Sequence, residues 1–368
     1  MRPIFVTSPS LPPLAEFIPY LEQIWESKWL TNNGQFHQQF EAALAEYLGV
    51  EYVSFFTNGM IALQVGMQAL QLTGEVITTP FTFVATTHAI QLHGCTPVFC
   101  DIEPHTFTLD PAKVESLITP RTTAIMPVHV YGNPCHHAPL QAIAKKHNLQ
   151  LFYDAAHVFG VKQNGNSVTN WGDLSMLSFH ATKVFNTLEG GALVTNDPAL
   201  KQRIDSLRNF GFANELQVTA TGTNGKVDEL RSAYGLLQLK YVDRAISNRQ
   251  QVATFYRDHL NAIPGIRILH DLPHVHHNYG YFPILVDAEN YGMSRDALYD
   301  KLKAHGIFAR RYFYPLCSHF PMYLNLPSAN PTNLPVAEKI AQQVLCLPIF
   351  ADLEQSAMTD IVRVITAR

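Results

Sequence analysis

An acid and a lysine follow short apolar runs in the middle of the chain. Asp154 comes directly after the run 151–153, and Lys183 lies just beyond a second run that ends at Ser178. A Glu-Gly-Gly turn at 189–191 then leads into a third apolar run. The stretch 151–196 therefore predicts three strands joined by loops, with the acid and the lysine beyond the ends of the first two strands.

An acid and a lysine at such positions suit a cofactor with a basic ring nitrogen and an aldehyde, and pyridoxal phosphate (PLP) is such a cofactor. Burial lowers the pKa of a lysine amine, which allows Lys183 to bind the aldehyde as a Schiff base. Once substrate amine displaces it, the freed Lys183 can carry the proton between the α-carbon and the cofactor. Asp154 would keep the ring nitrogen protonated, so that the ring accepts the electrons released on deprotonation. We predict that both residues are catalytic.

The phosphate of PLP needs hydrogen-bond donors. Gly59 begins an apolar helical pattern, so the amides of Gly59 and Met60 are expected to approach an anion at a helix N-terminus. Ser178 would add a hydroxyl. Phe83 is expected to stack on the cofactor ring and His157 to reach its hydroxyl, with a core position for Phe83 and a plain loop position for His157 as the alternatives.

Short strands and helices alternate over the first part of the chain. Strands are predicted at 52–56, 75–79, 97–100 and 123–128, and helices at 14–48 (interrupted at 30–34), 60–70, 82–93 and from the turn at 131–134 to 147. The alternation predicts βαβ units in a mostly parallel sheet. Ligands of such sheets bind at the carboxyl ends of the strands, where Gly59, Asp154 and Lys183 all fall.

The pattern changes after about residue 260. A helical stretch at 227–260 is long enough to bridge two domains. Beyond it, a strand and two helices are predicted at 281–286, 294–305 and 335–345. A chain of 368 residues can form one large and one smaller domain. We expect an α/β protein with a large domain over 1–245 and a small C-terminal α+β domain over 246–368.

The composition limits the possible partners. Charged residues make up 15% of the chain, well under the roughly 25% of ordinary globular chains, which suggests that part of the surface is covered in a homo-oligomer. A net charge of −4 gives no electrostatic reason to expect nucleic acid. Prolines interrupt the N-terminal 17 residues, and no apolar run reaches the length of a membrane span, so we expect a soluble, cytoplasmic protein.

The five cysteines are scattered and odd in number, so reduced thiols are expected rather than a disulfide framework. Two groups of histidines, at 136–137 and 274–277, lack the spacing of a metal site. We therefore predict no metal.

Several motifs together resemble the DegT/StrS-type nucleotide-sugar aminotransferases, which are PLP enzymes of fold type I. The resemblance covers nearly the whole chain, from the N-terminal region to residue 317. It rests on the segments PFTFVATTHAIQLHGCTPVFCDIEPHTFTLDP (80–111), YDAAHVFGV (153–161), SFHATK (178–183), EGGALVTND (189–197) and ARRYFYPLC (309–317).

The resemblance implies a role for each matching position. Lys183 matches the Schiff-base lysine and Asp154 the partner of the ring nitrogen, while Phe83 matches the stacking aromatic. The phosphate cradle is matched by Ser178, Gly59 and Met60, and by Asn224, which in the family reaches the cofactor phosphate of the neighbouring subunit. A homodimer with shared active sites is therefore implied. Weaker candidates line the substrate side: His180, Glu189, Arg310 and Tyr314.

The chain departs from the family pattern at two positions. Met60 stands where many members have Thr or Ser, so no hydroxyl is available there, and His157 stands where most have Gln. Some relatives carry His in place of the lysine and dehydrate keto-sugars, and Lys183 argues against that branch. Glu189 followed by two glycines is typical of members that act at C4 of the sugar.

The resemblance is strongest to the branch that makes dTDP-4-amino-4,6-dideoxyglucose. The function expected is transfer of an amino group from glutamate to the 4-keto carbon of a nucleotide-linked 4-keto-6-deoxyhexose, for the biosynthesis of O-antigen polysaccharide of lipopolysaccharide or of a related glycoconjugate. The alternatives are a C3-keto-sugar aminotransferase and a PLP-binding sensor or regulatory protein without turnover.

Overall fold

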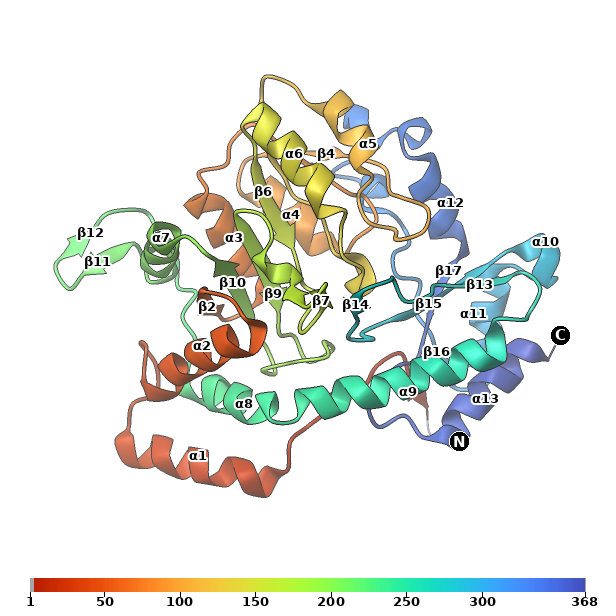
Figure 1. Cartoon of the computed structure of the whole chain (residues 1–368), viewed down its shortest axis with the longest axis horizontal. Helices are drawn as coiled ribbons and strands as arrows, with labels where there is room; N and C mark the ends of the chain where they lie inside the picture. Colours follow the sequence, from red (N-terminus) through yellow and green to blue (C-terminus); the bar gives the residue numbers. More distant parts are fainter. Residues whose placement is uncertain (1–2, 368) are drawn as a thin grey trace.

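A seven-stranded sheet forms the centre of the computed structural model, which describes residues 3–367 (Figure 1). The order of its strands is β2-β10-β9-β6-β5-β3-β4. The strands are β2 (Tyr52–Phe56), β3 (Glu75–Thr78), β4 (Thr96–Phe99), β5 (Thr122–Ile125), β6 (Gln150–Asp154), β9 (Leu174–Ser178) and β10 (Gly191–Thr195).

All strands of this sheet except β10 run in the same direction. The neighbours from β9 to β4 pair in parallel, and β10 is antiparallel to both β2 and β9. One edge of the sheet therefore carries the carboxyl ends of six strands and the amino end of β10. The predicted α/β class with a mostly parallel sheet is confirmed.

Helices cover both faces of the sheet because successive strand residues point to opposite sides. Phe152 packs with α3 (Gly59–Ala69), α4 (Val84–Leu92) and α7 (Pro198–Arg208). Its neighbours Leu151 and Tyr153 pack with α6 (His137–His147) on the other face. Both faces are buried, which explains why these strands read as continuous apolar runs.

Two further layers of helices lie beside the sheet. The helix α2 (Gln35–Leu48) packs against β2 and α8 (Glu229–Leu239), and α1 (Leu14–Ser27) packs against α8. The carboxylate of Glu229 caps α2 by accepting hydrogen bonds from the amides of Phe36 and His37, at 2.7 and 3.0 Å. Among the described residues, no helix is long and apolar enough to cross a membrane.

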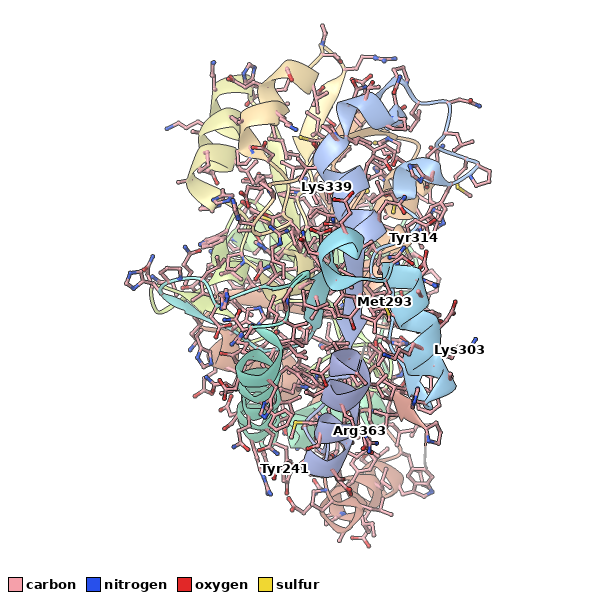
Figure 2. All side chains as sticks on the ribbon, turned by 90° about the vertical axis from the view of Figure 1, so that its right-hand side faces the viewer. Tyr241, Met293, Lys303, Tyr314, Lys339 and Arg363 are labelled. Atoms are coloured by element: carbon pink, nitrogen blue, oxygen red, sulfur yellow. The ribbon has the colours of Figure 1, made fainter. Side chains whose placement is uncertain are left out.

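A smaller antiparallel sheet follows the long helix α9 (Val242–Leu260). Its strand order is β13-β15-β17, with β13 (Ile266–Ile268), β15 (Phe282–Val286) and β17 (Val344–Leu347). Figure 2 looks onto the helices of this part, which Lys303, Lys339 and Arg363 mark in turn: α11 (Arg295–Ala304), α12 (Pro335–Gln343) and α13 (Gln355–Thr366).

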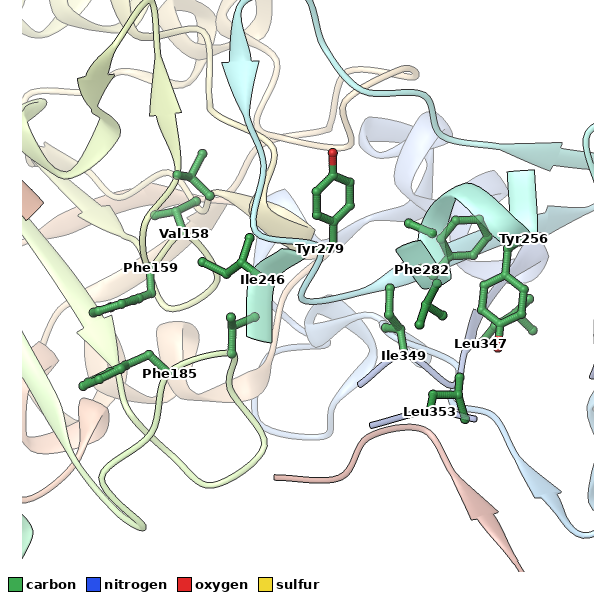
Figure 3. Close-up of a cluster of buried hydrophobic side chains, with 14 of the residues drawn as sticks. Val158, Phe159, Phe185, Ile246, Tyr256, Tyr279, Phe282, Leu347, Ile349 and Leu353 are labelled. Carbon is green, nitrogen blue, oxygen red and sulfur yellow. The ribbon is translucent and has the colours of Figure 1, made fainter. Parts of the chain in front are cut away.

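One apolar cluster joins the two parts of the chain. Phe159 and Phe185 from the region of the large sheet belong to the same cluster as Phe282 and Leu347 of the small sheet (Figure 3). Helix α9 runs through this cluster and contributes Ile246 near one end and Tyr256 near the other, together with further buried side chains. The core is therefore continuous across α9.

The remaining strands and α-helices are short. They are β1 (Ile4–Phe5) paired with β16 (Ile307–Phe308), β14 (Val275–His276) paired with β7 (Lys162–Gln163), β8 (Asn166–Ser167), the hairpin of β11 (Phe212–Asn214) and β12 (Gln217–Val218), α5 (Pro111–Val114) and α10 (Ala288–Tyr291). The hairpin extends away from the rest of the chain (Figure 1).

The predicted elements agree with the structure except at three places. The strand predicted over 123–128 is β5, which ends at Ile125. The helical stretch predicted over 227–260 is two helices, α8 and α9. The helix predicted to end at residue 345 ends at Gln343, because Val344 and Leu345 are buried and pair with β15. The division into domains at 245/246 falls inside α9 and stays a prediction.

Candidate active site

Lys183 lies in the loop between β9 and β10, at the edge of the sheet that carries most of the strand carboxyl ends. Its Nζ donates a hydrogen bond to the hydroxyl of Tyr281 at 3.3 Å. Burial lowers the pKa of Lys183 to about 8, and the nearby charge of Asp154 partly opposes this shift. About a tenth of the amine is therefore unprotonated at pH 7, far more than for a lysine of ordinary pKa, and attack on an aldehyde requires this form.

Asp154 ends β6 at the same edge and is buried. Its Oδ2 accepts a hydrogen bond from the Thr86 hydroxyl at 2.6 Å, and its Oδ1 accepts one from the Ala156 amide at 3.1 Å. Burial raises the pKa of Asp154, while these two donors and the charge of Lys183 act in the opposite direction. The side chain thus combines a buried carboxylate with a small set of donors from the protein.

Thr86 is a site residue that the sequence analysis missed. The hydroxyls of Thr82 and Thr86 lie 3.2 Å apart. An ionised carboxylate only accepts, so Thr86 donates to Asp154 and its oxygen is then free to accept from Thr82. The chain of two hydroxyls supports the charged form of Asp154. In the sequence, only the position of Thr86 in the first turn of a helix after a strand indicated that it could reach the site.

The phosphate donors predicted from the sequence lie together. Within residues 3–367, the amides of Gly59 and Met60 at the start of α3 have no hydrogen-bond acceptor, and neither has the Ser178 hydroxyl. Asn58 caps the same helix by accepting from the Ile61 amide at 2.9 Å. A Cβ at Gly59 would lie 3.5 Å from Ser178 Oγ, so the hydroxyl adjoins the helix N-terminus.

Gly191 allows this close arrangement. A Cβ on Gly191 would lie 2.6 Å from the amide nitrogen of Gly59, closer than atoms can approach without movement. Gly191 is the first residue of β10 and is paired with both Phe56 and Ser178. The second glycine of the Glu-Gly-Gly turn is therefore explained by the approach of β10 to the start of α3.

His157 is buried and held in one tautomer. Its Nδ1 accepts a hydrogen bond from the Tyr131 amide at 3.1 Å, so the proton of the neutral ring is on Nε2. Burial lowers the pKa of His157 well below its ordinary value, and the charge of Lys183 acts in the same direction. A neutral imidazole with a fixed Nε2–H is a hydrogen-bond donor, as is the side-chain amide of Gln.

Phe83 lies directly before α4, and 58% of its surface is exposed. The alternative that it is a core residue is therefore wrong. An exposed ring three residues before Thr86, whose hydroxyl binds Asp154, leaves the predicted stacking role open.

The weaker candidates are distributed over several segments. His180 and Glu189 are both exposed and lie side by side, with 3.5 Å between Nε2 and Oε1. Tyr314 is partly exposed, with the guanidinium of Arg295 4.6 Å from its ring centre. Arg310 is exposed. Among the described residues no hydrogen bond or ion pair joins Arg310 or Tyr314 to His180 or Glu189, so their substrate roles stay predictions.

Asn224 is exposed and follows the hairpin of β11 and β12. The next residue, Gly225, accepts a hydrogen bond from the amide of Thr57 in the same chain at 3.1 Å. Asn224 is therefore near Thr57, which directly follows β2 and lies two residues before Gly59. Its reach to the phosphate of a second subunit stays a prediction.

The hydrogen-bond donors and the ionisable groups of these residues fit the phosphate, the aldehyde and the ring nitrogen of PLP. Unpartnered amides and a hydroxyl at a helix N-terminus suit a phosphate, and the close approach of Gly191 keeps side chains out of that cradle. A lysine with a lowered pKa and a buried aspartate suit the aldehyde and the ring nitrogen.

The fold and the site together define a PLP-dependent transferase of fold type I that acts as an aminotransferase. The model of the DegT/DnrJ/EryC1/StrS aminotransferase family matches residues 14–366. The chain belongs to this family, and PLP is its cofactor.

The similarity to known members extends over the full chain. A dTDP-4-amino-4,6-dideoxy-D-glucose transaminase of Shigella dysenteriae is 51% identical, covering 99% of this chain and 98% of the relative. An Escherichia coli protein with the same name is 48% identical, covering 100% and 99%. The crystal structure of DesI in the presence of its TDP-sugar product has a TM-score of 0.93 at 38% identity, covering 99% and 92%.

Proposed function

We propose that this aminotransferase moves the amino group of glutamate to the 4-keto carbon of dTDP-4-keto-6-deoxyglucose, giving dTDP-4-amino-4,6-dideoxyglucose. The observation that carries the proposal is the identity of 51% and 48%, over nearly all of both chains, to two transaminases named for that product. The Glu-Gly-Gly turn at 189–191 is typical of members that act at C4, which supports amino transfer to that carbon.

We assign the reaction to the two residues at the centre of the site. PLP, when bound, supplies the electron sink that makes the α-carbon of the amino donor acidic. Lys183 Nζ would hold the cofactor through its aldehyde, and its free amine can take and return the proton. Asp154 would hold the ring nitrogen in its protonated form. The amides of Gly59 and Met60 and the Ser178 hydroxyl would hold the phosphate, and His157 would donate to the ring hydroxyl.

We further propose a cytoplasmic homodimer with shared active sites, working in O-antigen or related glycoconjugate biosynthesis. The hairpin of β11 and β12 exposes apolar side chains on an extended arm, with Leu216 94% and Val218 57% exposed, which supports burial against a second copy. Asn224 follows this hairpin. Size-exclusion chromatography with light scattering of the wild type and Leu216→Asp tests the dimer, because a charge at a buried apolar contact weakens association.

The test of the reaction uses the purified protein loaded with PLP, glutamate, and dTDP-, UDP- or GDP-linked 4-keto-6-deoxyglucose. We expect turnover to be fastest with the dTDP sugar, and NMR of the product to place the new amine at C4. Turnover of the corresponding 3-keto sugar, with the 4-keto sugars left unchanged, would instead identify a C3 aminotransferase. A protein that binds PLP but is unchanged by glutamate would be a sensor, and either result would overturn the proposal.

A further inference from the structure

Tyr281 is the one hydrogen-bond partner of Lys183 Nζ among the described residues, at 3.3 Å. It lies directly before β15, so the contact joins the small sheet to the lysine of the large sheet across 98 residues of sequence.

The ring of Tyr281 is held on several sides by other rings. Its centre lies 4.6 Å from that of His157, 5.6 Å from that of Tyr131 and 5.9 Å from that of Tyr312. Rings packed in this way restrict the side chain to one orientation. The hydroxyl is therefore fixed in place relative to Lys183.

The hydroxyl of Tyr281 is uncharged at neutral pH. Burial raises its pKa, with smaller contributions in the same direction from Cys346 and Asp154, while Arg249 opposes them. A neutral phenol has one donor and two acceptor positions. It can therefore accept from an ammonium group and also donate to a free amine. A carboxylate can only accept, and an ammonium group can only donate.

We propose that Tyr281 Oη orients Lys183 Nζ in both of its protonation states during amino transfer. When Lys183 is an ammonium group, an N–H of Nζ donates to Oη. When Lys183 is a free amine, the O–H of Tyr281 donates to the nitrogen lone pair, so Nζ keeps one position before and after it takes up a proton. This inference rests on the proposed function, because it assigns Tyr281 to the proton transfer of Lys183.

Loss of the Tyr281 hydroxyl is therefore expected to lower the rate of proton transfer by Lys183 and to leave the binding of PLP and glutamate nearly unchanged. A freely rotating amine spends less time in the position for proton transfer, and a misplacement of about 1 Å can cost about 100-fold in rate. The contact is to the lysine and not to the phosphate donors, so cofactor binding is expected to survive its loss. Glutamate affinity is expected to change little for the same reason.

The experiment compares Tyr281→Phe with a matched control, Tyr312→Phe. Both changes remove one hydroxyl from the same group of rings, but within the described residues the Tyr312 hydroxyl has no hydrogen bond to Lys183. Rapid mixing of each PLP-loaded protein with glutamate, followed by the visible absorption of bound PLP, gives the rate of the half-reaction and its dependence on glutamate concentration.

We expect the limiting rate of Tyr281→Phe to fall about 10- to 100-fold, with the half-saturating glutamate concentration and the melting temperature close to wild type. Tyr312→Phe is expected to react like the wild type. Equal rates in Tyr281→Phe and the wild type would overturn the inference, and so would an equal loss in both variants. A wild-type protein that glutamate leaves unchanged would contradict the proposed function instead.

Discussion

Two buried aspartates lie at the same edge of the large sheet and have different surroundings. Asp101 follows β4 and accepts hydrogen bonds from Lys113 Nζ at 2.7 Å and from the amides of Val336 and Ala337 at 3.1 and 2.8 Å. Asp154 ends β6 and receives one hydroxyl and one amide. Its neighbouring lysine, Lys183, is hydrogen-bonded to Tyr281 rather than to the carboxylate.

The difference shows that a strand-end position does not by itself make an acid functional. The carboxylate of Asp101 is occupied by a cation and by the first amides of α12, which fixes the start of that helix against the large sheet. Asp154 accepts from only two donors, one on each carboxylate oxygen, so each oxygen can still accept another hydrogen bond. An additional donor such as a protonated ring nitrogen completes its set.

The lysines beside the two aspartates give the largest expected contrast. Lys183→Ala removes the amine that binds PLP, so we expect the visible absorption of bound PLP and the aminotransferase activity to be lost together. Lys113→Ala removes the ion pair of Asp101 and is expected to keep the absorption band. Spectra of the two purified variants check this, and a band that persists in Lys183→Ala would show that Lys183 does not bind the cofactor.

Asp154→Asn keeps the size of the side chain and removes its charge. The ring nitrogen then has no anion to hold its proton, so we expect kcat/KM for amino transfer to fall about 10²- to 10⁴-fold, comparable with the loss of a catalytic acid or base. Steady-state kinetics with glutamate and the keto-sugar measure the loss. Wild-type kinetics in Asp154→Asn would show that Asp154, like Asp101, has no catalytic role.

Asp101→Asn is expected to affect stability instead. It leaves Lys113 without its anion and weakens two hydrogen bonds at the start of α12, which we expect to lower the free energy of unfolding by about 2–3 kcal/mol, the range for a partly buried pair. Urea unfolding followed by circular dichroism measures the change. The folded fraction of this variant should retain nearly full kcat/KM, in contrast to Asp154→Asn.

The same two aspartates show how far the sequence could predict this site. The apolar runs that end near Asp154, Lys183 and Gly59 mark strand ends, and a parallel sheet brings strand ends to one edge. The partners of each acid are not readable in this way. Thr86 is 68 residues from Asp154, and Ala337 is 236 residues from Asp101. Which hydroxyl or helix meets which acid depends on strand order and on the packing of the small sheet.

Thr86→Val tests whether the donors of Asp154 set its charge, and it has the smallest effect of the series. Burial already raises the pKa of Asp154, and the Thr86 hydroxyl opposes that shift. Removing the hydroxyl should raise the pKa further, so more of the carboxylate is protonated at a given pH. The acid limb of the kcat/KM profile should therefore move to higher pH, so the loss of activity grows as the pH falls. Thr86→Ser, which keeps the hydroxyl, should restore the wild-type profile. A profile that Thr86→Val leaves in place would mean that the amide of Ala156 and the charge of Lys183 are enough to keep Asp154 ionised.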